Sequence, residues 1–160
     1  MMESFSNLGR YVSICDRLMK MYYDRGLSEF EIGWGQQFYV EYLYDHPGAS
    51  PQEMVSCIHV DKATLTKIIK KLMEVGYLQV TSDGKDRRVK HLYLTEKAVP
   101  AAMRIKQIHA AFYEVLSAGI PPEELALTER TLQRMADNIH HTVWHRMEEH
   151  HGSKRTLAAD

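Results

Sequence analysis

The chain has 160 residues, of which 44% are hydrophobic and 26% are charged, and its formal net charge is −1. These values exclude a disordered chain and fit one domain of ordinary size, or a small domain carrying long helical arms. No apolar run approaches the roughly 20 residues of a membrane span, and the N-terminus lacks a signal-peptide pattern, so we expect a cytoplasmic protein. Cys15 and Cys57 lie far apart and form no CxxC motif, which argues against a disulfide framework and against a structural zinc site.

Two helices are predicted within the first 45 residues. Apolar residues recur at three- and four-residue steps from Leu8 to Tyr22, the pattern of an amphipathic helix, and Gly26 is its expected end. A second helix is predicted from Gly35 to Asp45, because the sequence HPG that follows stops helices. Its expected inward face consists of Tyr39, Val40 and Leu43.

A short helix with a clear start signal is predicted next. Ser50 can cap it, Pro51 suits the first helical position, and Glu53 completes a capping box three residues after the cap. The helix should extend to Ile58. Its expected buried residues are Met54, Val55 and Ile58.

A basic helix is predicted to follow after a link of about three residues, with Asp61 as its cap and Gly76 as its end. One face is an apolar stripe of Leu65, Ile68, Ile69, Leu72 and Met73. The opposite face carries Lys62, Thr64, Thr66, Lys67, Lys70 and Lys71. Two short helices joined in this way, the second of them basic, predict a helix-turn-helix.

A β-hairpin is predicted directly afterwards. The sequences YLQV and VKHLYL alternate apolar and polar residues, and the dipeptide Asp83-Gly84 between them has turn chemistry. Leu78, Val80, Leu92 and Leu94 should share one face. The tip gathers Lys85, Arg87, Arg88 and Lys90 around a single acid, Asp86. Residues 61–97 hold nine Lys or Arg against five Asp or Glu, a local charge of +4 that leaves −5 for the rest of the chain.

The C-terminal third is predicted to form two long helices. Thr95 can cap the first, which should extend to about Ser117 and tolerate Pro100 near its start. The sequence GIPPEE breaks the chain, and the last helix is expected from Pro122 to about Glu149. The remaining residues have the composition of a disordered tail.

A helix-turn-helix followed at once by a basic hairpin predicts a winged helix. An α-helix fits the major groove of DNA, where its first residues meet base edges. Arginines on a narrow tip can enter the minor groove, where the negative potential is strongest. A solvated charged hairpin is the alternative for the tip alone, but the adjacent basic helix favours DNA binding.

The stretch from Ser50 to Ala98 resembles the core of the MarR family of bacterial transcriptional regulators. The wing of that family carries D-x-R, then a short strand, then L-T-x-x-G. Asp86 and Arg88 match the D-x-R, Leu94 and Thr95 match the L-T, and Ala98 replaces the final glycine. With the flanking helices, the resemblance covers roughly residues 8–148.

The resemblance implies a mainly α fold with a small β-hairpin wing, in which a winged helix-turn-helix core is flanked by N- and C-terminal dimerisation helices. The implied segments are a dimerisation helix (1–33), a DNA-binding lobe (34–95), further dimerisation helices (96–149) and a disordered tail (150–160). By this resemblance Asp86 orients Arg88, and the Lys62 to Lys67 end of the recognition helix enters the major groove.

We therefore expect a homodimeric regulator that binds a pseudo-palindromic site on double-stranded DNA, represses transcription and is released by a small ligand. The expected DNA contacts are Lys62, Thr64, Thr66, Lys67, Lys70, Lys85, Arg87, Arg88 and Lys90. No catalytic motif is present, and no enzyme activity, cofactor or membrane partner is expected. The rival function is a winged helix that binds an acidic protein partner.

Sensory sites form a second group of alternatives. His141 and His145 lie one helical turn apart, a spacing that could hold a metal if a carboxylate joined them. Cys15 lies on the apolar face of the first helix, where a free cysteine usually packs as a small hydrophobe; in peroxide-sensing members of the family this helix carries a reactive cysteine. The candidate pocket for a small aromatic ligand consists of Tyr22, Trp34, Phe38, Tyr39 and Tyr42, for which core packing is the alternative.

Overall fold

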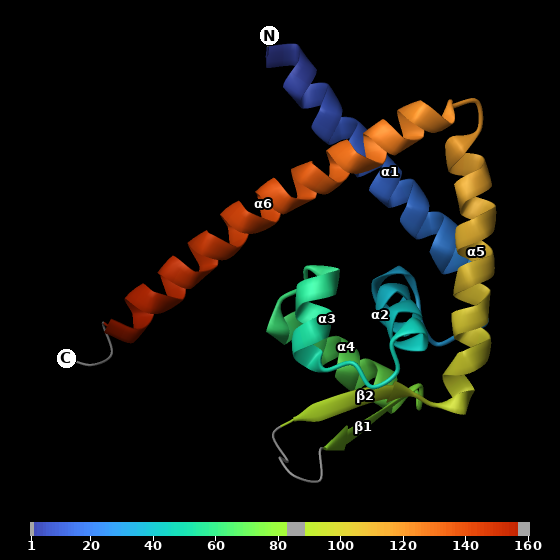
Figure 1. Cartoon of the computed structure of the whole chain (residues 1–160), viewed down its shortest axis with the longest axis vertical. Helices are drawn as coiled ribbons and strands as arrows, with labels where there is room; N and C mark the ends of the chain where they lie inside the picture. Colours follow the sequence, from blue (N-terminus) through green and yellow to red (C-terminus); the bar gives the residue numbers. More distant parts are fainter. Residues whose placement is uncertain (1, 83–88, 157–160) are drawn as a thin grey trace. The chain divides into compact units, whose positions relative to one another are not determined.

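The chain folds mainly into helices (Figure 1). The described residues also contain a single antiparallel β-hairpin. The computed structural model describes the backbone of residues 2–82 and 89–156, and the side chains of residues 7–82 and 89–142. The elements are α1 (Met2–Gly26), α2 (Trp34–Asp45), α3 (Pro51–Ile58), α4 (Lys62–Glu74), β1 (Leu78–Ser82), β2 (Lys90–Leu94), the 3-10 helix η1 (Glu96–Ala98), α5 (Val99–Ser117) and α6 (Pro122–Thr156). The predicted fold class is confirmed.

Two compact units make up the chain, and the division falls after Glu114, inside α5. The first unit contains α1 to α4, the hairpin, η1 and most of α5. The second contains the end of α5 and the whole of α6. The predicted domains, which are defined by function, stay a prediction.

Side-chain caps fix where the two helices of the predicted helix-turn-helix begin. At α3 the Ser50 hydroxyl accepts from the Glu53 amide at 3.2 Å, and the Ser50 amide donates to the Glu53 carboxylate at 2.6 Å. At α4 the Asp61 carboxylate accepts from the Thr64 amide at 2.8 Å. These bonds satisfy amides that have no partner inside the helix, so the predicted caps and the predicted capping box are confirmed.

The hairpin has the predicted apolar face, and its second strand is attached to the link between α2 and α3. Leu78 pairs with Leu94 and Val80 with Leu92, which places the apolar side chains on one face. On its other edge Leu92 accepts from the Gly48 amide at 2.9 Å and donates to the Ala49 carbonyl at 3.0 Å. A third bond runs from the Nδ1 of His91 to the Gly48 carbonyl at 2.9 Å. The hairpin is therefore held to the α2–α3 link by three hydrogen bonds.

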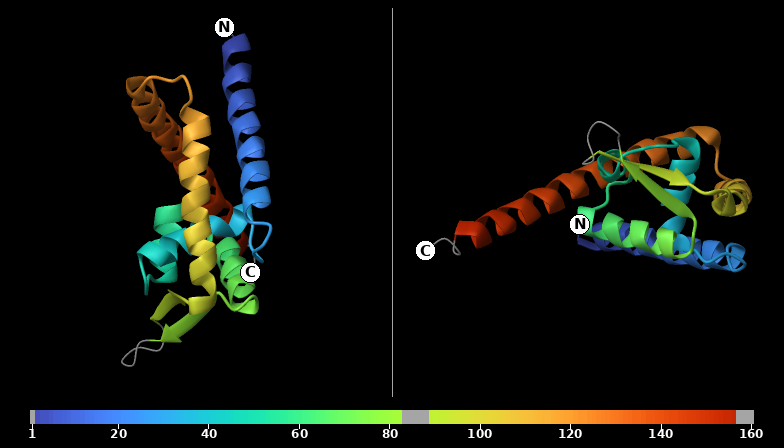
Figure 2. Two further views of the ribbon diagram at one scale, coloured as in Figure 1. Left: turned by 90° about the vertical axis from the view of Figure 1, so that its right-hand side faces the viewer. Right: turned by 90° about the horizontal axis from the view of Figure 1, so that it is seen from below.

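The core of the first unit receives side chains from each of its main elements. Its largest fully buried side chains are Leu27, Gln37, Val40, Leu43, Met54, Leu72, Leu92 and Ile105. The predicted inward face of α2 is buried, and Gln37 is an additional polar member of it. Helix α5 runs beside the end of α1 (Figure 2), where the guanidinium of Arg104 donates to the Gly26 carbonyl at 3.2 Å.

Three predictions about local structure need correction. Thr95 makes no side-chain cap, because its hydroxyl donates to the Gly76 carbonyl at 2.6 Å, and η1 precedes α5. Met73 is 49% exposed, since it lies at the edge of the apolar stripe of α4. Helix α6 extends past Glu149 to Thr156, so the predicted disordered tail is helical up to that residue. Lys154 and Arg155 are good helix formers, and the single glycine costs only about 1 kcal/mol.

Candidate nucleic-acid interface

Helix α4 presents a row of exposed cations. Lys62, Lys67, Lys70 and Lys71 are all exposed, as the sequence predicts for the face opposite the apolar stripe. Within the described part of the chain, the Lys70 ammonium lies 3.9 Å from the Glu74 carboxylate, and both side chains are more than half exposed. An exposed pair at this distance gains little, so the lysines are available to an anionic partner.

The threonines of α4 are committed to hydrogen bonds of the helix itself. The Thr64 hydroxyl donates to the Asp61 carboxylate at 2.5 Å, and the side chain is half-buried rather than on the exposed side as predicted. This hydroxyl bond and the bond from the Thr64 amide hold the pKa of Asp61 below its usual range. Thr66 is exposed, and its hydroxyl donates to the Lys62 carbonyl at 2.7 Å.

A hollow of about 450 Å³ lies between α3, α4 and the hairpin. Its lining residues are Pro51, Gln52, Val55, Lys62, Leu65, Thr66, Ile69, Met73, Val80, Lys90 and Leu92. The hollow brings Lys62 and Thr66 of the recognition helix together with Lys90 of β2, three residues that the sequence assigns to one function. Gln52 was missed by the sequence argument, although its place in the first turn of α3 puts it beside the next helix.

The tip of the hairpin, residues 83–88, lies outside the described residues. The predicted contacts Lys85, Arg87 and Arg88 and the predicted orienting residue Asp86 are all in this segment. Their roles therefore stay a prediction. Lys90, the first residue of β2, is described and exposed.

Lys97 is one of the nine cations of residues 61–97, but its ammonium bonds to other parts of the same chain. Its ammonium donates to the Val75 carbonyl at 2.7 Å and to the Glu31 carboxylate at 3.1 Å. It also lies 5.5 Å from the centre of the Tyr77 ring. Lys97 is therefore bound to the end of α4, although its side chain is 58% exposed. Counting charges in the sequence could not reveal these contacts.

The aromatic residues of the candidate ligand pocket do not line one hollow in the structure. Tyr39 is 5% exposed and belongs to the core, and the Trp34 and Phe38 rings pack edge to face at 5.0 Å. Phe38 and Tyr42 line a hollow of about 450 Å³ beside α3. There the Tyr42 hydroxyl bonds to the Cys57 sulfur at 3.5 Å, which raises the pKa of Tyr42 to about 12.

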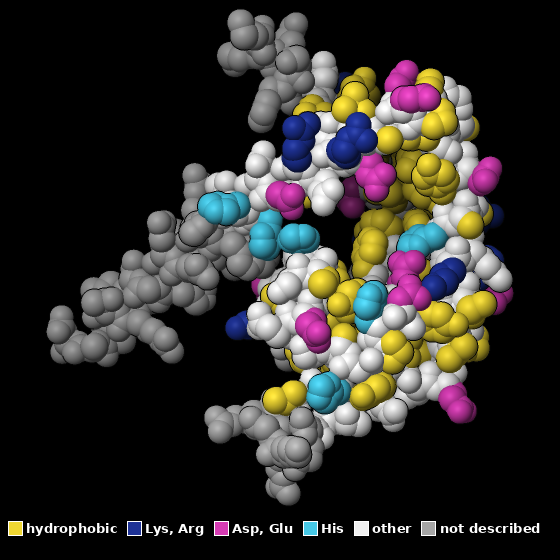
Figure 3. Space-filling model, viewed as in Figure 1, with side chains coloured by type: hydrophobic (Ala, Val, Ile, Leu, Met, Phe, Trp, Pro, Cys, Tyr) yellow, Lys and Arg dark blue, Asp and Glu magenta, His cyan; other side chains and the backbone are white. Residues whose placement is uncertain are grey.

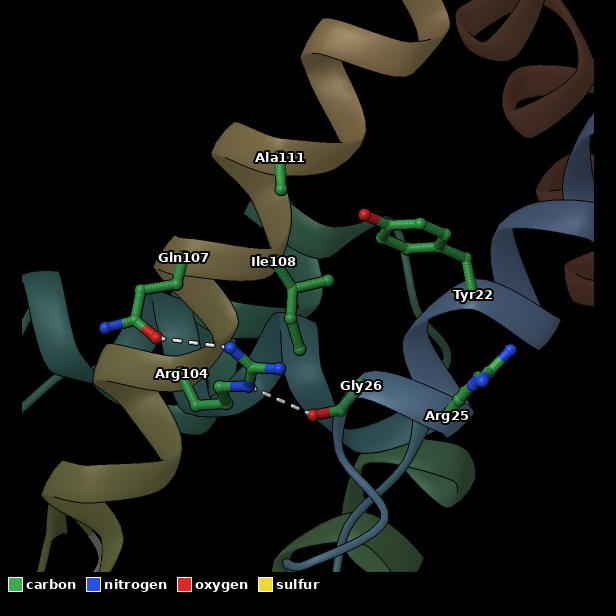
Figure 4. A pocket seen from close by; sticks show the side chains of 7 residues that line it. All are labelled: Tyr22, Arg25, Gly26, Arg104, Gln107, Ile108 and Ala111. Carbon is green, nitrogen blue, oxygen red and sulfur yellow. Dashed lines mark hydrogen bonds between the residues drawn. The ribbon is translucent and has the colours of Figure 1, made fainter.

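Tyr22 lines a different hollow, of about 400 Å³, between α1 and α5 (Figure 4). Arg104 stands at its wall, held by the Gly26 carbonyl and by a bond of 3.3 Å to the Gln107 side chain. Tyr23, the neighbour of Tyr22, is instead buried among aromatic rings. Burial, reinforced by the Glu41 carboxylate, raises its pKa to about 12.

The residues proposed as sensors are dispersed. Cys15 is exposed and forms no disulfide, so it does not pack in the apolar face as expected. His141 is exposed, and the side chain of His145 lies outside the described part. Among the described residues, no group of three or more His, Cys, Asp or Glu side chains could hold a metal ion. None of the described helices is both long enough and apolar enough to cross a membrane.

Comparison with known proteins identifies a family whose sequences match the helix-turn-helix region. Residues 33–90, which contain the helix-turn-helix and most of the hairpin, match the model of the MarR family. YybA of Bacillus subtilis strain 168, an uncharacterized HTH-type transcriptional regulator, is 28% identical over 112 residues, which cover 70% of this chain and 75% of YybA.

Solved structures give the same result for the larger part of the chain. A MarR protein from Peptoclostridium difficile DA00132 is similar with a TM-score of 0.77 and 27% identity, covering 84% of this chain and 88% of that one. Streptococcus pneumoniae FabT in complex with DNA shares the fold, with a TM-score of 0.68, 22% identity and coverage of 84% and 96%. Proteins of this family are transcription regulators and not enzymes. Residues 33–90 thus match the MarR family, and the larger part of the chain has the fold of winged helix-turn-helix transcriptional regulators of that family.

Proposed function

We propose that the protein binds a pseudo-palindromic DNA operator as a homodimer and represses transcription. The observation that carries this proposal is the hollow between α3, α4 and the hairpin, where Lys62 and Thr66 face the same space as Lys90. Helix α4 would lie in the major groove, and the hairpin would reach the adjacent minor groove. The phosphate strand that separates the two grooves would then pass beside the hollow.

The charges on both sides of the hollow support this arrangement. On α4 the ion pair between Lys70 and Glu74 is long, at 3.9 Å, and exposed, and Lys90 is exposed at the start of β2. Phosphate contacts supply most of the affinity of such proteins, whereas base contacts supply the sequence preference. We assign Lys70 and Lys90 to phosphate contact, and we assign base contact to Lys62, Thr64, Thr66 and Lys67 at the start of α4, together with Arg88.

Dimerisation is supported by apolar side chains that the described chain leaves uncovered, some of which are visible in Figure 3. Those on α1 include Leu8, Tyr11, Val12, Leu18 and Met21, all at least 44% exposed. Further ones are Val115 and Leu116 at the end of α5, and Leu127, Leu132 and Ile139 on α6. So large an exposed apolar surface is unusual for a monomer, and a symmetric partner would cover it.

Release by a small aromatic ligand and action in the cytoplasm complete the proposal. The hollow lined by Tyr22 and Arg104 and the hollow lined by Phe38 and Tyr42 have volumes that suit small molecules. A metal or redox sensor built on His141 and His145 or on Cys15 is not favoured, because the described residues supply no third metal ligand and Cys15 has no partner thiol.

The test combines mass with salt dependence. Light scattering should report twice the mass of one chain, and a monomer at micromolar concentration would contradict the proposed dimer. If the dimer contacts on the order of 6 to 10 phosphates, log K for operator DNA should fall with log salt at a slope of about −5 to −9. Operator DNA is first isolated by selection from random sequence. A slope near zero, with no selected sequence, would favour the rival winged helix that binds an acidic protein.

A further inference from the structure

The link between α4 and β1 is held by three consecutive hydrogen bonds from one segment. The Val75 carbonyl accepts from the Lys97 ammonium at 2.7 Å. The Gly76 carbonyl accepts from the Thr95 hydroxyl at 2.6 Å, and the Tyr77 carbonyl accepts from the Thr95 amide at 3.0 Å. Every carbonyl of the link thus has a donor in the two residues Thr95 and Lys97, which we call the link clamp.

Lys97 contributes more than one hydrogen bond to the clamp. Its stem passes over Gly76, where a Cβ would lie 3.6 Å from the Lys97 Cδ, and Gly76 has a φ of +73°, which ends the helix. Its ammonium meets the last carbonyls of α4, where a positive charge complements the helix dipole. The same ammonium binds Glu31 in the segment between α1 and α2, at 3.1 Å.

We infer that Thr95 and Lys97 are positioning residues that set the angle of the recognition helix and thereby the spacing between the two DNA half-sites. This inference rests on the proposed function. Lys97 lies within η1, and α5 follows η1 without a break, so the clamp joins the end of α4 directly to the start of α5. A change in the angle between the two helices would therefore strain these hydrogen bonds.

The geometry of α4 converts a small angular error into a change of register on DNA. A helix of 13 residues is about 20 Å long at 1.5 Å per residue. A tilt of roughly 10° about its clamped end would move its first residues by about 3.4 Å, which is the rise of one base pair. Because half-site spacing in a dimer is fixed by the positions of its two recognition helices, loosening the clamp should relax that spacing.

The test is selection of DNA sites by Lys97→Met, which keeps the length of the stem and removes the ammonium. The library carries two half-sites separated by spacers of variable length. Wild type should prefer one spacing over a spacing one base pair longer. For Lys97→Met we expect the ratio of sites selected at these two spacings to fall at least fivefold, while the selected half-site bases stay the same. Lys97→Arg, which can donate to the same carbonyl and carboxylate, should keep the preference.

Two further variants make the result specific. Thr95→Val removes the hydroxyl bond to Gly76 at constant size and should relax the spacing in the same direction. Lys106→Met is the matched control, because Lys106 binds Asp45 at 2.6 Å from the same helix α5 without touching the link, and it should leave the spacing unchanged. Folded Lys97→Met and Thr95→Val proteins with wild-type spacing preference would overturn the inference. A wild-type protein that selects no sequence at all would overturn the proposed function and this inference with it.

Discussion

Replacing Gly48 with alanine should loosen the base of the hairpin. Gly48 has a φ of +85°, a conformation that costs other residues about 1–2 kcal/mol. An added Cβ would also lie 2.8 Å from the Tyr93 hydroxyl and 3.0 Å from the ring carbon that carries it. Crowding of a packed site costs about 1–3 kcal/mol, so we expect Gly48→Ala to lower the free energy of unfolding by about 2–5 kcal/mol.

Thermal denaturation followed by circular dichroism measures this loss. For a chain of this length, 1 kcal/mol corresponds to about 2–4 °C in Tm, so Gly48→Ala should lower Tm by roughly 4–20 °C. Gly35→Ala is the matched control, because Gly35 is exposed in α2 and its added Cβ meets nothing within 4 Å. That control should be neutral or stabilising by up to about 1 kcal/mol.

A second substitution separates the two causes. Tyr93→Phe in the Gly48→Ala background removes the hydroxyl that crowds the new Cβ but leaves the backbone conformation unchanged. It should therefore recover only the part of the crowding cost that comes from the hydroxyl, because the ring carbon at 3.0 Å remains, and the backbone cost of about 1–2 kcal/mol also remains. A Gly48→Ala protein as stable as wild type would refute the argument from backbone conformation and crowding.

Four further predictions concern DNA binding and acid stability. Lys90→Ala should make the slope of log K against log salt less negative by about 0.9 per subunit in anisotropy titrations, whereas Lys20→Ala on α1 should leave it unchanged. Arg88→Ala should weaken operator binding by about 2–6 kcal/mol per dimer, roughly 30-fold or more, with Tm unchanged. Asp86→Ala should also weaken binding, and tighter binding would refute its orienting role. The pKa of Asp61 is lowered in the fold, so the ionised carboxylate contributes to the free energy of unfolding above its unfolded pKa. This contribution disappears as pH falls through the folded pKa. In acid denaturation below about pH 4, the Asp61→Asn protein should therefore lose less stability than wild type does.

The elements were predictable wherever their signals are local in sequence. The capping residues of α3 and α4 are within three residues of the amides that they bind, and the hairpin register follows from alternation of apolar residues. Short-range chemistry of this kind needs no knowledge of the fold. The same is true of the exposed lysines of α4, because the apolar stripe determines which face points outward.

The remaining features depend on partners that are distant in sequence. The Thr95 hydroxyl binds a carbonyl 19 residues away, and Lys97 binds Glu31, which is 66 residues away. Nothing near Thr95 in the sequence distinguishes these contacts from a helix cap. The aromatic residues were grouped by proximity in sequence, but their partners come from distant segments. Tyr39 is buried in the core, whereas Tyr42, one helical turn later, reaches Cys57 of α3.

The bonds from Gly48 and Ala49 to Leu92 also determine which edge of the hairpin is open. A strand edge with unpaired amides and carbonyls invites another strand to add to it, and an isolated two-stranded hairpin is only marginally stable in water. Here the outer edge of β2 is closed at its middle residue by the chain's own α2–α3 link. Strand addition by a second molecule is thereby directed away from β2 and toward β1, so the link acts as protection against edge-to-edge aggregation as well as an anchor for the hairpin.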